Sequence, residues 1–238
     1  MNIKGKTALI TGGTKGIGYG IAEMLLNKGV SVCITGRNEE TVRESASQLD
    51  QLGEAKAIGV AADVRSYEDM QNVISEMEAQ LGQMDVVIAN AGLGKFGSIE
   101  DMSHEDFTLT VDTNLTGVFN TVKPAIDALK KTKGYVITIA SLAGTNFFAG
   151  GSAYNASKFG LVGFSQAVML DLRHYGIKVT TIMPGSVTSH FNDHTPNESD
   201  AWKIQPEDIG EMVIYLLETN PRSLPSKIEV RPSMPPKR

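Results

Sequence analysis

The sequence predicts an α/β protein built on a doubly wound parallel sheet of about seven strands, with helices on both faces. Three observations support this fold class. Short apolar runs alternate with longer segments of helical periodicity along the chain. The runs are continuous rather than alternating, as expected for strands buried on both faces. Glycine makes up 24 of the 238 residues and recurs between a helical segment and the next run.

The seven expected strands are continuous apolar or β-branched stretches: Thr7–Thr11, Ser31–Thr35, Ala55–Val60, Asp85–Ala89, Gly134–Ala140, Lys178–Met183 and Lys227–Arg231. Helical periodicity marks segments between them, with apolar residues repeating along one face: 17–25, Tyr67–Leu81, Ser152–Tyr175 and 206–217. No linker-like stretch interrupts the series. The sequence therefore predicts one domain over residues 1–238.

Five glycines separate helical segments from strands: Gly29, Gly53, Gly82, Gly134 and Gly176. We expect each to adopt the left-handed conformation after a helix end, because a Cβ atom is costly there. Repeated helix–glycine–strand units with right-handed crossovers give a parallel sheet covered on both faces.

Charge and cysteine content exclude several function classes. Lys and Arg number 22 and Asp and Glu 27, a net charge of −5, which argues against a nucleic-acid partner. The basic cluster at residues 130–133 is interpreted as a solvated helix end. Cys33 is the single cysteine, so no disulfide or cysteine-based metal site can form within the chain. Its apolar neighbours predict a buried, inert thiol.

The N-terminal segment shows no apolar region of the signal-peptide type. Residues 1–6 lead directly into a strand, and no apolar run approaches the ~18 residues needed to cross a bilayer. These observations predict a cytoplasmic protein without a membrane partner. The tail, Arg231–Arg238, has three prolines and is expected to be extended, with no assigned role.

A glycine-rich turn follows the first strand and opens the first helix, reading T-G-G-T-K-G-I-G over residues 11–18. Such a turn lets the backbone approach a pyrophosphate at the helix N-terminus. Its spacing differs from the common G-x-G-x-x-G, and a tight turn without a ligand is the alternative. The residues expected to bind the cofactor here are Gly12, Thr14, Lys15, Gly16, Ile17 and Gly18.

The end of the second strand predicts which nucleotide is bound. A cofactor with a free 2′-hydroxyl usually meets a carboxylate at this point. Here Gly36 is followed by Arg37, while Glu39 lies past the strand. Arg37 would pair with a 2′-phosphate through charge-assisted hydrogen bonds, and Lys15 adds a second cation. The sequence therefore predicts NADP(H) rather than NAD(H).

Three further residues form a candidate catalytic group. Tyr154 and Lys158 are four positions apart, so they share a helix face. A free tyrosine has a pKa of ~10, and a nearby ammonium is expected to lower the pKa of Tyr154. Ser141 falls at the end of the fifth strand, on the edge that borders the ligand crevice in parallel sheets. Its hydroxyl can donate a hydrogen bond to a carbonyl oxygen.

Together these motifs resemble the short-chain dehydrogenase/reductase family, in its single-domain, NADP(H)-preferring branch with a Rossmann-type fold. The matching segments follow the family's order: T-G-x-x-x-G-I-G at 11–18, Asp63-Val64, Asn90-Ala91-Gly92, Asn114, Ser141, Tyr154-x-x-x-Lys158, and Pro184-Gly185 with Thr188. The first residue of the usual N-N-A-G is Ala89 here, a small departure.

The resemblance implies a role for each matched residue. Tyr154 would be the general acid in reduction and the base in oxidation, and Ser141 would hold the substrate carbonyl. Lys158 would bind the nicotinamide ribose, and Asn114 would hold a water that links Lys158 to solvent. The implied cofactor contacts are Asp63 and Val64 at the adenine, Asn90, Ala91 and Gly92 beneath the fourth strand, and Pro184, Gly185, Val187 and Thr188 around the nicotinamide.

The substrate pocket is less defined by the sequence. Candidate walls follow Asn90, Ser141 and Pro184: Leu93, Ala143, Phe147, Phe148 and Phe191. Phe147 and Phe148 could equally lie in a subunit interface. The polar segment 186–205 is expected to be a mobile lid whose return is anchored by Trp202. Its histidines, His190 and His194, are interpreted as solvated.

The expected function is reversible NADPH-dependent reduction of an aldehyde or ketone, a small-molecule substrate. A 3-ketoacyl-acyl-carrier-protein reductase is the alternative, with Lys130, Lys131 and Arg173 available to dock an acidic carrier. The last strand ends in Arg-Pro rather than in the glycine-rich end of those enzymes. A non-catalytic NADP(H)-binding sensor is a second alternative. The resemblance also implies a homotetramer or homodimer.

Overall fold

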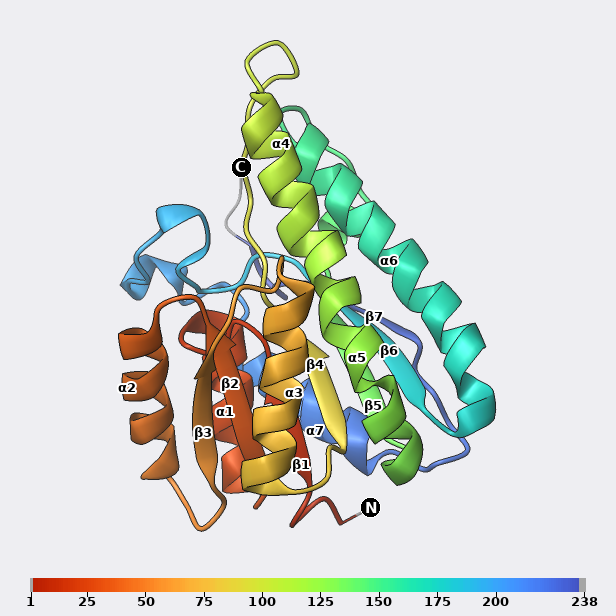
Figure 1. The fold of residues 1–238 in the computed structure, drawn as a ribbon. Helices are drawn as coiled ribbons and strands as arrows, with labels where there is room; N and C mark the ends of the chain where they lie inside the picture. The colour runs from red at the N-terminus through yellow and green to blue at the C-terminus, as the bar shows by residue number, and fades with distance from the viewer. Residues whose placement is uncertain (1, 236–238) are drawn as a thin grey trace.

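A computed structural model describes residues 2–235 of the chain. Its single sheet has seven parallel strands in the order β3-β2-β1-β4-β5-β6-β7 (Figure 1). The strands are β1 (Thr7–Ile10), β2 (Ser31–Gly36), β3 (Ala57–Ala61), β4 (Val86–Ala89), β5 (Tyr135–Ile139), β6 (Lys178–Pro184) and β7 (Lys227–Val230). The predicted fold class is confirmed. The strand order reverses between β1 and β4, where such sheets bind ligands.

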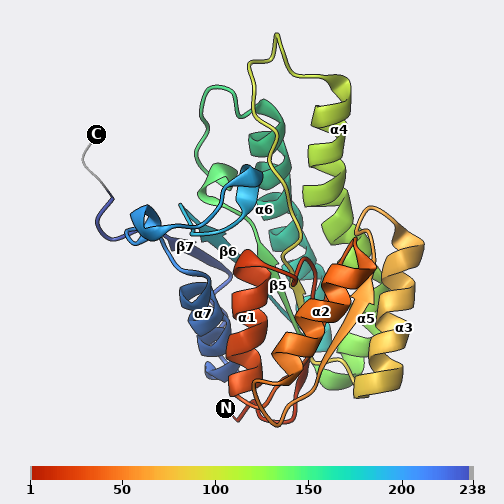
Figure 2. The ribbon, with the colours of Figure 1, turned by 90° about the vertical axis from the view of Figure 1, so that its left-hand side faces the viewer.

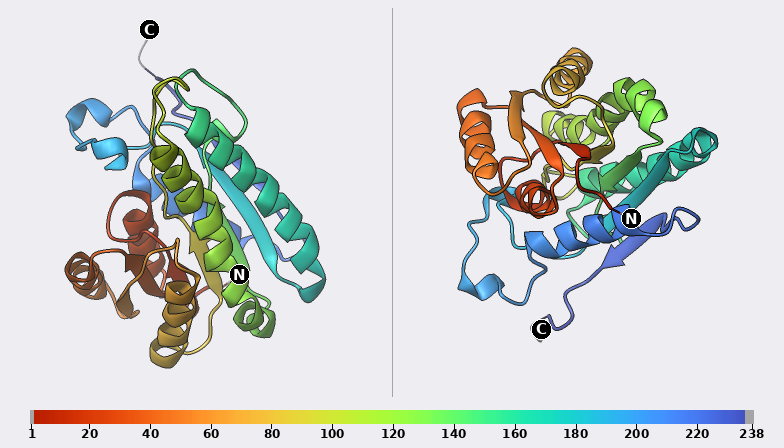
Figure 3. Two further views of the ribbon diagram at one scale, coloured as in Figure 1. Left: turned by 45° about the horizontal axis from the view of Figure 1, so that its top comes forward. Right: turned by 90° about the horizontal axis from the view of Figure 1, so that it is seen from below.

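The helices form a layer on each face of this sheet. They are α1 (Gly16–Asn27), α2 (Glu39–Asp50), α3 (Tyr67–Leu81), α4 (His104–Val111), α5 (Gly117–Thr132), α6 (Ser152–Leu172) and α7 (Pro206–Glu218). In Figure 1, α3, α5 and α6 lie in front of the sheet and α1 and α7 lie behind it. The view from below in Figure 3 separates the same two layers, and Figure 2 brings α1, α2 and α7 forward.

The strands are apolar throughout because both of their faces are covered. On β1, Ala8 and Ile10 belong to the core beneath α1 and α7, whereas Leu9 belongs to the core beneath α3 and α5. All three side chains are fully buried. Cys33 of β2 is buried in the second core, and burial raises the pKa of its thiol to about 12. The prediction of a buried thiol is confirmed.

Three of the five predicted helix-ending glycines have the expected positive φ, although Gly82, with ψ −130°, lies outside the left-handed helical region. Gly29, Gly82 and Gly176 have φ angles of 75°, 86° and 80°. The prediction is wrong for Gly53, which lies three residues beyond the end of α2 at Asp50 and does not have a positive φ.

It is also wrong for Gly134, and the reason is close packing. The left-handed position after α5 is taken by Lys133, with φ 51°. A Cβ atom on Gly134 would lie 2.5 Å from both the Asp85 carbonyl oxygen and the Leu129 side chain. Glycine is therefore required there by the space between α5 and the sheet.

The ends of the chain add little regular structure. Residues 231–235 follow β7 without a helix or strand, whereas Met1 and residues 236–238 of the predicted extended tail lie outside the described part. Across residues 2–235, every helix is too short or too polar to cross a bilayer.

Candidate active site

A cavity of about 490 Å³ opens at the carboxyl ends of the central strands. It lies at the strand-order reversal, where the chain passes from β1 into α1 and from β4 towards α4. Thirteen of the predicted cofactor and catalytic residues line it: Gly12, Thr14, Lys15, Gly16, Ile17, Arg37, Asp63, Val64, Asn90, Ala91, Gly92, Tyr154 and Lys158. The structure thus brings together residues spread over nearly 150 positions of sequence.

The glycine-rich turn has the backbone geometry that a phosphate cradle needs. Gly12 and Gly16 have φ angles of 65° and 59°, which L-residues with side chains rarely adopt. Asn90 holds the turn from the neighbouring strand end by donating from Nδ2 to the carbonyls of Thr11 (2.9 Å) and Gly12 (3.1 Å). The free N–H groups that begin α1 at Gly16 lie beside the cavity, where they favour an anion.

Gly18 contributes differently from the expectation. It does not line the cavity, because it packs under the turn. A Cβ atom at this position would lie 2.4 Å from the Gly12 carbonyl oxygen and 2.6 Å from the Asn90 amide nitrogen. Gly18 therefore shapes the cradle by letting α1 approach it closely.

Positive charge gathers where the ends of β2 and β3 meet the cavity. Lys15, Arg37 and Arg65 all line it, facing one carboxylate, Asp63. Arg65 Nε donates to both Asp63 oxygens at 3.0 Å, and this pairing lowers the pKa of Asp63. Arg65 was not predicted from the sequence. Its position directly after the Asp63-Val64 motif is the signal that could have revealed it.

Gly36 has a steric reason to be glycine. A Cβ atom there would lie 2.9 Å from the Thr14 side chain and 3.0 Å from that of Val42. The absent side chain lets the glycine-rich turn pack on β2 and leaves no carboxylate at this position.

A π-helical turn over Asp112–Thr116 joins α4 to α5 and carries Asn114. Such turns are rare and often lie at functional sites. Asn114 is fully buried, accepts a hydrogen bond from the Leu93 N–H (2.9 Å) and donates to the Leu93 carbonyl (2.8 Å) and Ser157 Oγ (3.0 Å). Asn114 thereby ties the segment after β4 to α6.

Gly92 lies between Asn114 and Lys158. A Cβ atom on Gly92 would be 3.1 Å from Asn114 Oδ1 and 3.6 Å from Lys158 Nζ. Any side chain at this position would therefore crowd the space between the amide oxygen and the ammonium.

Lys158 is buried, and its Nζ donates to the Ile139 carbonyl at the end of β5 (3.1 Å). Burial lowers the pKa of its ammonium to about 8. The Nζ atom lies 5.7 Å from the centre of the Tyr154 ring. Helical spacing thus places both groups on the cavity side of α6, as predicted.

The predicted direction of the Tyr154 pKa is wrong in this structure. Desolvation raises the pKa of Tyr154, and a hydrogen bond with the Ser141 hydroxyl offsets part of this rise. Lys158 does not lower the pKa of Tyr154 below its ordinary value, because the Lys158 Nζ donates to the Ile139 carbonyl instead. Ser141 lies next to the cavity-lining Ala140, and its Oγ also accepts from the Ala143 N–H (3.1 Å).

The segment after β6 lies differently from the expectation. Pro184, Gly185, Val187 and Thr188 are not among the lining residues, which at this point are Ser189, His190 and Phe191. The chain from 187 pairs back with Ile204: the Thr188 N–H donates to the Ile204 carbonyl at 2.9 Å. This pairing draws residues 187–188 away from the cavity and turns the segment back towards α7.

An ionic latch holds the predicted lid, residues 186–205. The buried Asp200 carboxylate contacts His194 Nε2 and Lys203 Nζ, each at 2.5 Å. These contacts lower the pKa of Asp200 to about 2. His194 is therefore paired, so its interpretation as solvated is wrong, whereas His190 is exposed, as predicted, and borders the cavity. A loop of this composition gives no sequence signal for such pairing.

The predicted substrate walls separate into two groups. Leu93 and Phe191 line the cavity. Ala143 is buried and accepts a hydrogen bond from Asn155 instead, whereas Phe147 is 85% exposed. Phe148 contacts Phe96, an aromatic residue that sequence reasoning missed, with ring centres 6.0 Å apart.

Comparison with known proteins agrees with this geometry. The family model for short chain dehydrogenases matches residues 6–200. The chain belongs to the short-chain dehydrogenase family.

Relatives of this short-chain dehydrogenase cover nearly its whole length. An uncharacterized oxidoreductase of Staphylococcus aureus is 33% identical over 228 residues, 95% of this chain and 97% of the relative. The alcohol dehydrogenase of the archaeon Thermococcus sibiricus, solved with 5-hydroxy-NADP, superposes with a TM-score of 0.91 at 26% identity, covering 98% of this chain and 99% of that one. A variant of actinorhodin polyketide ketoreductase, solved with NADPH, superposes with a TM-score of 0.86 at 28% identity. The match covers 98% of this chain and 97% of that one.

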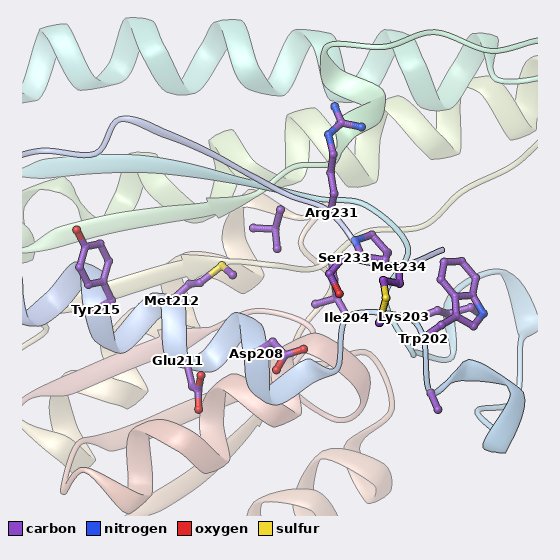
Figure 4. A pocket seen from close by; sticks show the side chains of 13 residues that line it. Trp202, Lys203, Ile204, Asp208, Glu211, Met212, Tyr215, Arg231, Ser233 and Met234 are labelled. Carbon is purple, nitrogen blue, oxygen red and sulfur yellow. The ribbon is translucent and has the colours of Figure 1, made fainter. Parts of the chain in front are cut away.

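This short-chain dehydrogenase has a second hollow, of about 690 Å³, between α7 and the chain that follows β7. Figure 4 shows Met212 and Tyr215 of α7 on one side and Arg231, Ser233 and Met234 on the other. Trp202 borders this hollow and not the active-site cavity. No residue of the predicted cofactor or catalytic set lines this second hollow.

Proposed function

We propose that this protein reduces an aldehyde or ketone to an alcohol with NADPH, reversibly, and that Tyr154 is the proton donor. The observation that carries the proposal is the convergence of Tyr154, Lys158 and the glycine-rich turn on one cavity, with Ser141 hydrogen-bonded to Tyr154. A two-electron carbonyl reduction needs a cofactor cradle, a carbonyl-binding donor and a proton source, and these residues supply each of them.

NADPH supplies the hydride that reaches the carbonyl carbon. The Ser141 hydroxyl donates to the carbonyl oxygen and orients it, and the Tyr154 hydroxyl transfers its proton to the same oxygen as the C–H bond forms. With its pKa raised by burial, the Tyr154 hydroxyl carries its proton near neutral pH, as the role of proton donor requires. Lys158 would hold the nicotinamide ribose, and Asn114 would bind the water that links Lys158 to solvent.

The preference for NADPH rests on charge at the adenine end of the cavity. Arg37 and Lys15 face the position of a 2′-phosphate, and Arg65 is held beside them by Asp63. Guanidinium groups pair with phosphate oxygens through strong, charge-assisted hydrogen bonds. The carboxylate that would bind a free 2′-hydroxyl is replaced by Gly36. Asp63 and Val64 would contact the adenine, and Pro184, Gly185, Val187 and Thr188 would approach the nicotinamide when the lid closes.

A 3-ketoacyl-carrier substrate is the second candidate, favoured by the likeness to a polyketide ketoreductase. The positions of the cations proposed to dock a carrier argue against a carrier-bound substrate. Lys130 and Lys131 end α5, and Arg173 follows α6, about 19 residues or ~28 Å along the helix from Tyr154. Lys130 also pairs with Asp127, and Lys131 with Glu78. A carrier bound there would lie at the opposite end of the sheet from the cavity.

The proposal extends to the setting of the enzyme. We propose a single catalytic domain over residues 1–238, a cytoplasmic location and a homotetramer or homodimer. These rest on the unbroken strand–helix series and on the family resemblance. Light scattering of the purified chain tests the oligomeric state.

The decisive experiment measures NADPH oxidation with a panel of aldehydes, ketones and an acetoacetyl thioester. We expect turnover of simple carbonyl compounds, and at least a 100-fold loss of kcat in Tyr154→Phe with unchanged NADPH binding. Tyr215→Phe, which alters an exposed tyrosine of the second hollow, is the control and should keep full activity. Tight NADPH binding with no turnover across the panel would favour the sensor, and full activity in Tyr154→Phe would refute the mechanism.

A further inference from the structure

Two phenylalanine rings pack against the Tyr154 ring, and a third packs against one of these two. Phe96 lies 5.3 Å from it, centre to centre, and Phe191 lies 5.5 Å from it. Phe96 and Phe191 are 6.2 Å apart, and Phe148 is 6.0 Å from Phe96. These residues come from four separate parts of the chain: the segment after β4, the segment after β5, α6 and the lid. We call Phe96, Phe148 and Phe191 the aromatic box.

The backbone around the box makes room for the rings. A Cβ atom on Gly94 would lie 2.6 Å from the Phe191 ring and 2.7 Å from the Phe96 ring. A Cβ atom on Gly151 would lie 2.7 Å from the Phe148 ring. Two glycines thus allow the box to close against the main chain next to the catalytic tyrosine.

The rings retain apolar surface that the protein itself does not bury. Phe96 is 42% exposed, Phe148 49% and Phe191 37%. Aromatic rings packed edge-to-face at these distances attract further rings in the same geometry. Burying the remaining surface against an apolar ligand is favourable, because apolar area is removed from water.

Charge at this end of the cavity does not suit an anionic substrate. Lys95, next to Phe96, pairs with Asp106 (3.7 Å), and Lys158 donates to the Ile139 carbonyl. The groups nearest the reacting carbonyl are therefore the hydroxyls of Ser141 and Tyr154 and the rings of the box.

We propose that the aromatic box is the substrate-binding subsite and that it selects neutral carbonyl compounds carrying a flat aromatic group, with Phe96 and Phe191 as the specificity-determining residues. This inference rests on the proposed carbonyl reduction. Phe191 belongs to the lid, so lid closure and recognition of the aromatic group are coupled. Phe96 belongs to the segment after β4 and contacts the rings of Phe148, Tyr154 and Phe191.

The test compares three ketones whose carbonyl groups have the same electronic surroundings: 4-phenyl-2-butanone, 4-cyclohexyl-2-butanone and 2-butanone. With NADPH saturating, we expect kcat/KM to be highest for the phenyl ketone and lowest for 2-butanone, by roughly 30-fold overall. Phe96→Leu and Phe191→Leu should each lower the ratio of kcat/KM for the phenyl ketone to kcat/KM for 2-butanone about tenfold. Phe147→Leu, at the exposed neighbour of the box, is the matched control and should leave all three values unchanged.

Equal kcat/KM for the three ketones would overturn the inference while leaving the carbonyl reduction intact. Equal effects of Phe96→Leu and Phe147→Leu would also overturn it. If no ketone is reduced, the proposed function fails, and binding of 4-phenyl-2-butanol to the NADP⁺ complex then tests the box by itself. Weaker binding in Phe96→Leu than in Phe147→Leu would support the box, and equal binding would refute it.

Discussion

The cofactor side and the substrate side of the cavity are built in different ways. The cofactor side is formed by short motifs that directly follow β1, β2, β3 and β4, so the parallel sheet alone brings them together. The proposed substrate side is assembled from the segments around Phe96, Phe148 and Phe191, which meet only through tertiary packing. The difference suggests that changes on the cofactor side act on every substrate alike, whereas changes on the substrate side distinguish one substrate from another.

The largest effect that tests this comparison is expected at Gly18. In Gly18→Ala the new methyl group would overlap the Gly12 carbonyl, 2.4 Å away, and displace the phosphate cradle. We expect NADPH to bind more than 100-fold more weakly by fluorescence titration, with equal losses of kcat/KM for all ketones.

The control is Gly163→Ala in α6, where a Cβ atom meets nothing within 4 Å. This variant should bind NADPH normally and be slightly more stable, because alanine favours the helix. Normal NADPH binding in Gly18→Ala would contradict the close-packing argument.

Arg37→Ala tests the charge at the adenine end. Loss of the guanidinium removes a charge-assisted contact with a 2′-phosphate but affects NADH little. The ratio of kcat/KM for NADPH to that for NADH should fall roughly 30-fold. Arg43→Ala, which removes a cation of α2 that does not line the cavity, should leave the ratio unchanged. An unchanged preference in Arg37→Ala would show that the NADP(H) assignment is wrong.

Lys158→Met should separate stability from activity. The pKa of Lys158 is lowered to about 8 in the folded protein, so the folded state binds fewer protons than the unfolded state between pH 8 and ~10.4. The charged lysine therefore destabilises the fold below pH 8, and stability rises as the pH passes above that value. At pH 7 the free energy of unfolding of Lys158→Met should exceed that of the parent by ~2 kcal/mol, as measured by denaturant titration. The variant should lose its activity.

The stabilities of Lys158→Met and of the parent protein are compared in the absence of cofactor. The gain in stability should shrink as the pH rises from 8 towards 10. A variant that is less stable than the parent at pH 7 would contradict the cost assigned to the buried ammonium.

The smallest expected effect lies in the lid. Asp200→Asn removes the charge that holds His194 and Lys203, so the lid should close less often. We expect KM for the phenyl ketone to rise about threefold, with kcat and NADPH binding nearly unchanged. Glu198→Gln changes an exposed acid of the same segment and serves as the control.

The stability that the Asp200 contacts contribute should also depend on pH. The pKa of Asp200 is lowered to about 2, below its value of ~3.9 in an unfolded chain. Its stabilising contribution is therefore fully present above about pH 4 and is lost as the pH falls towards 2. Thermal unfolding of the parent and Asp200→Asn should differ at pH 6 and converge near pH 2. A constant difference across this range would rule out the ionic latch.

Several features could be predicted from particular residues. The positions of the strands were predicted from continuous apolar runs. The exact ends of a strand were harder to predict: the third strand lies at Ala57–Ala61 rather than at 55–60. The spacing of Tyr154 and Lys158 predicted a shared helix face. The direction of the Tyr154 pKa could not be predicted, because it depends on burial and on where the Lys158 ammonium points.

The sequence by itself determined the parallel sheet, the glycine-rich turn and the order of the motifs along its edge, since these depend on local periodicity and on contacts between neighbouring strand ends. Only the tertiary structure decided which rings surround Tyr154, how Asp200 holds the lid and why Gly18 and Gly134 lack side chains. Those features arise from packing between distant segments, whose closeness in space leaves no pattern in the sequence.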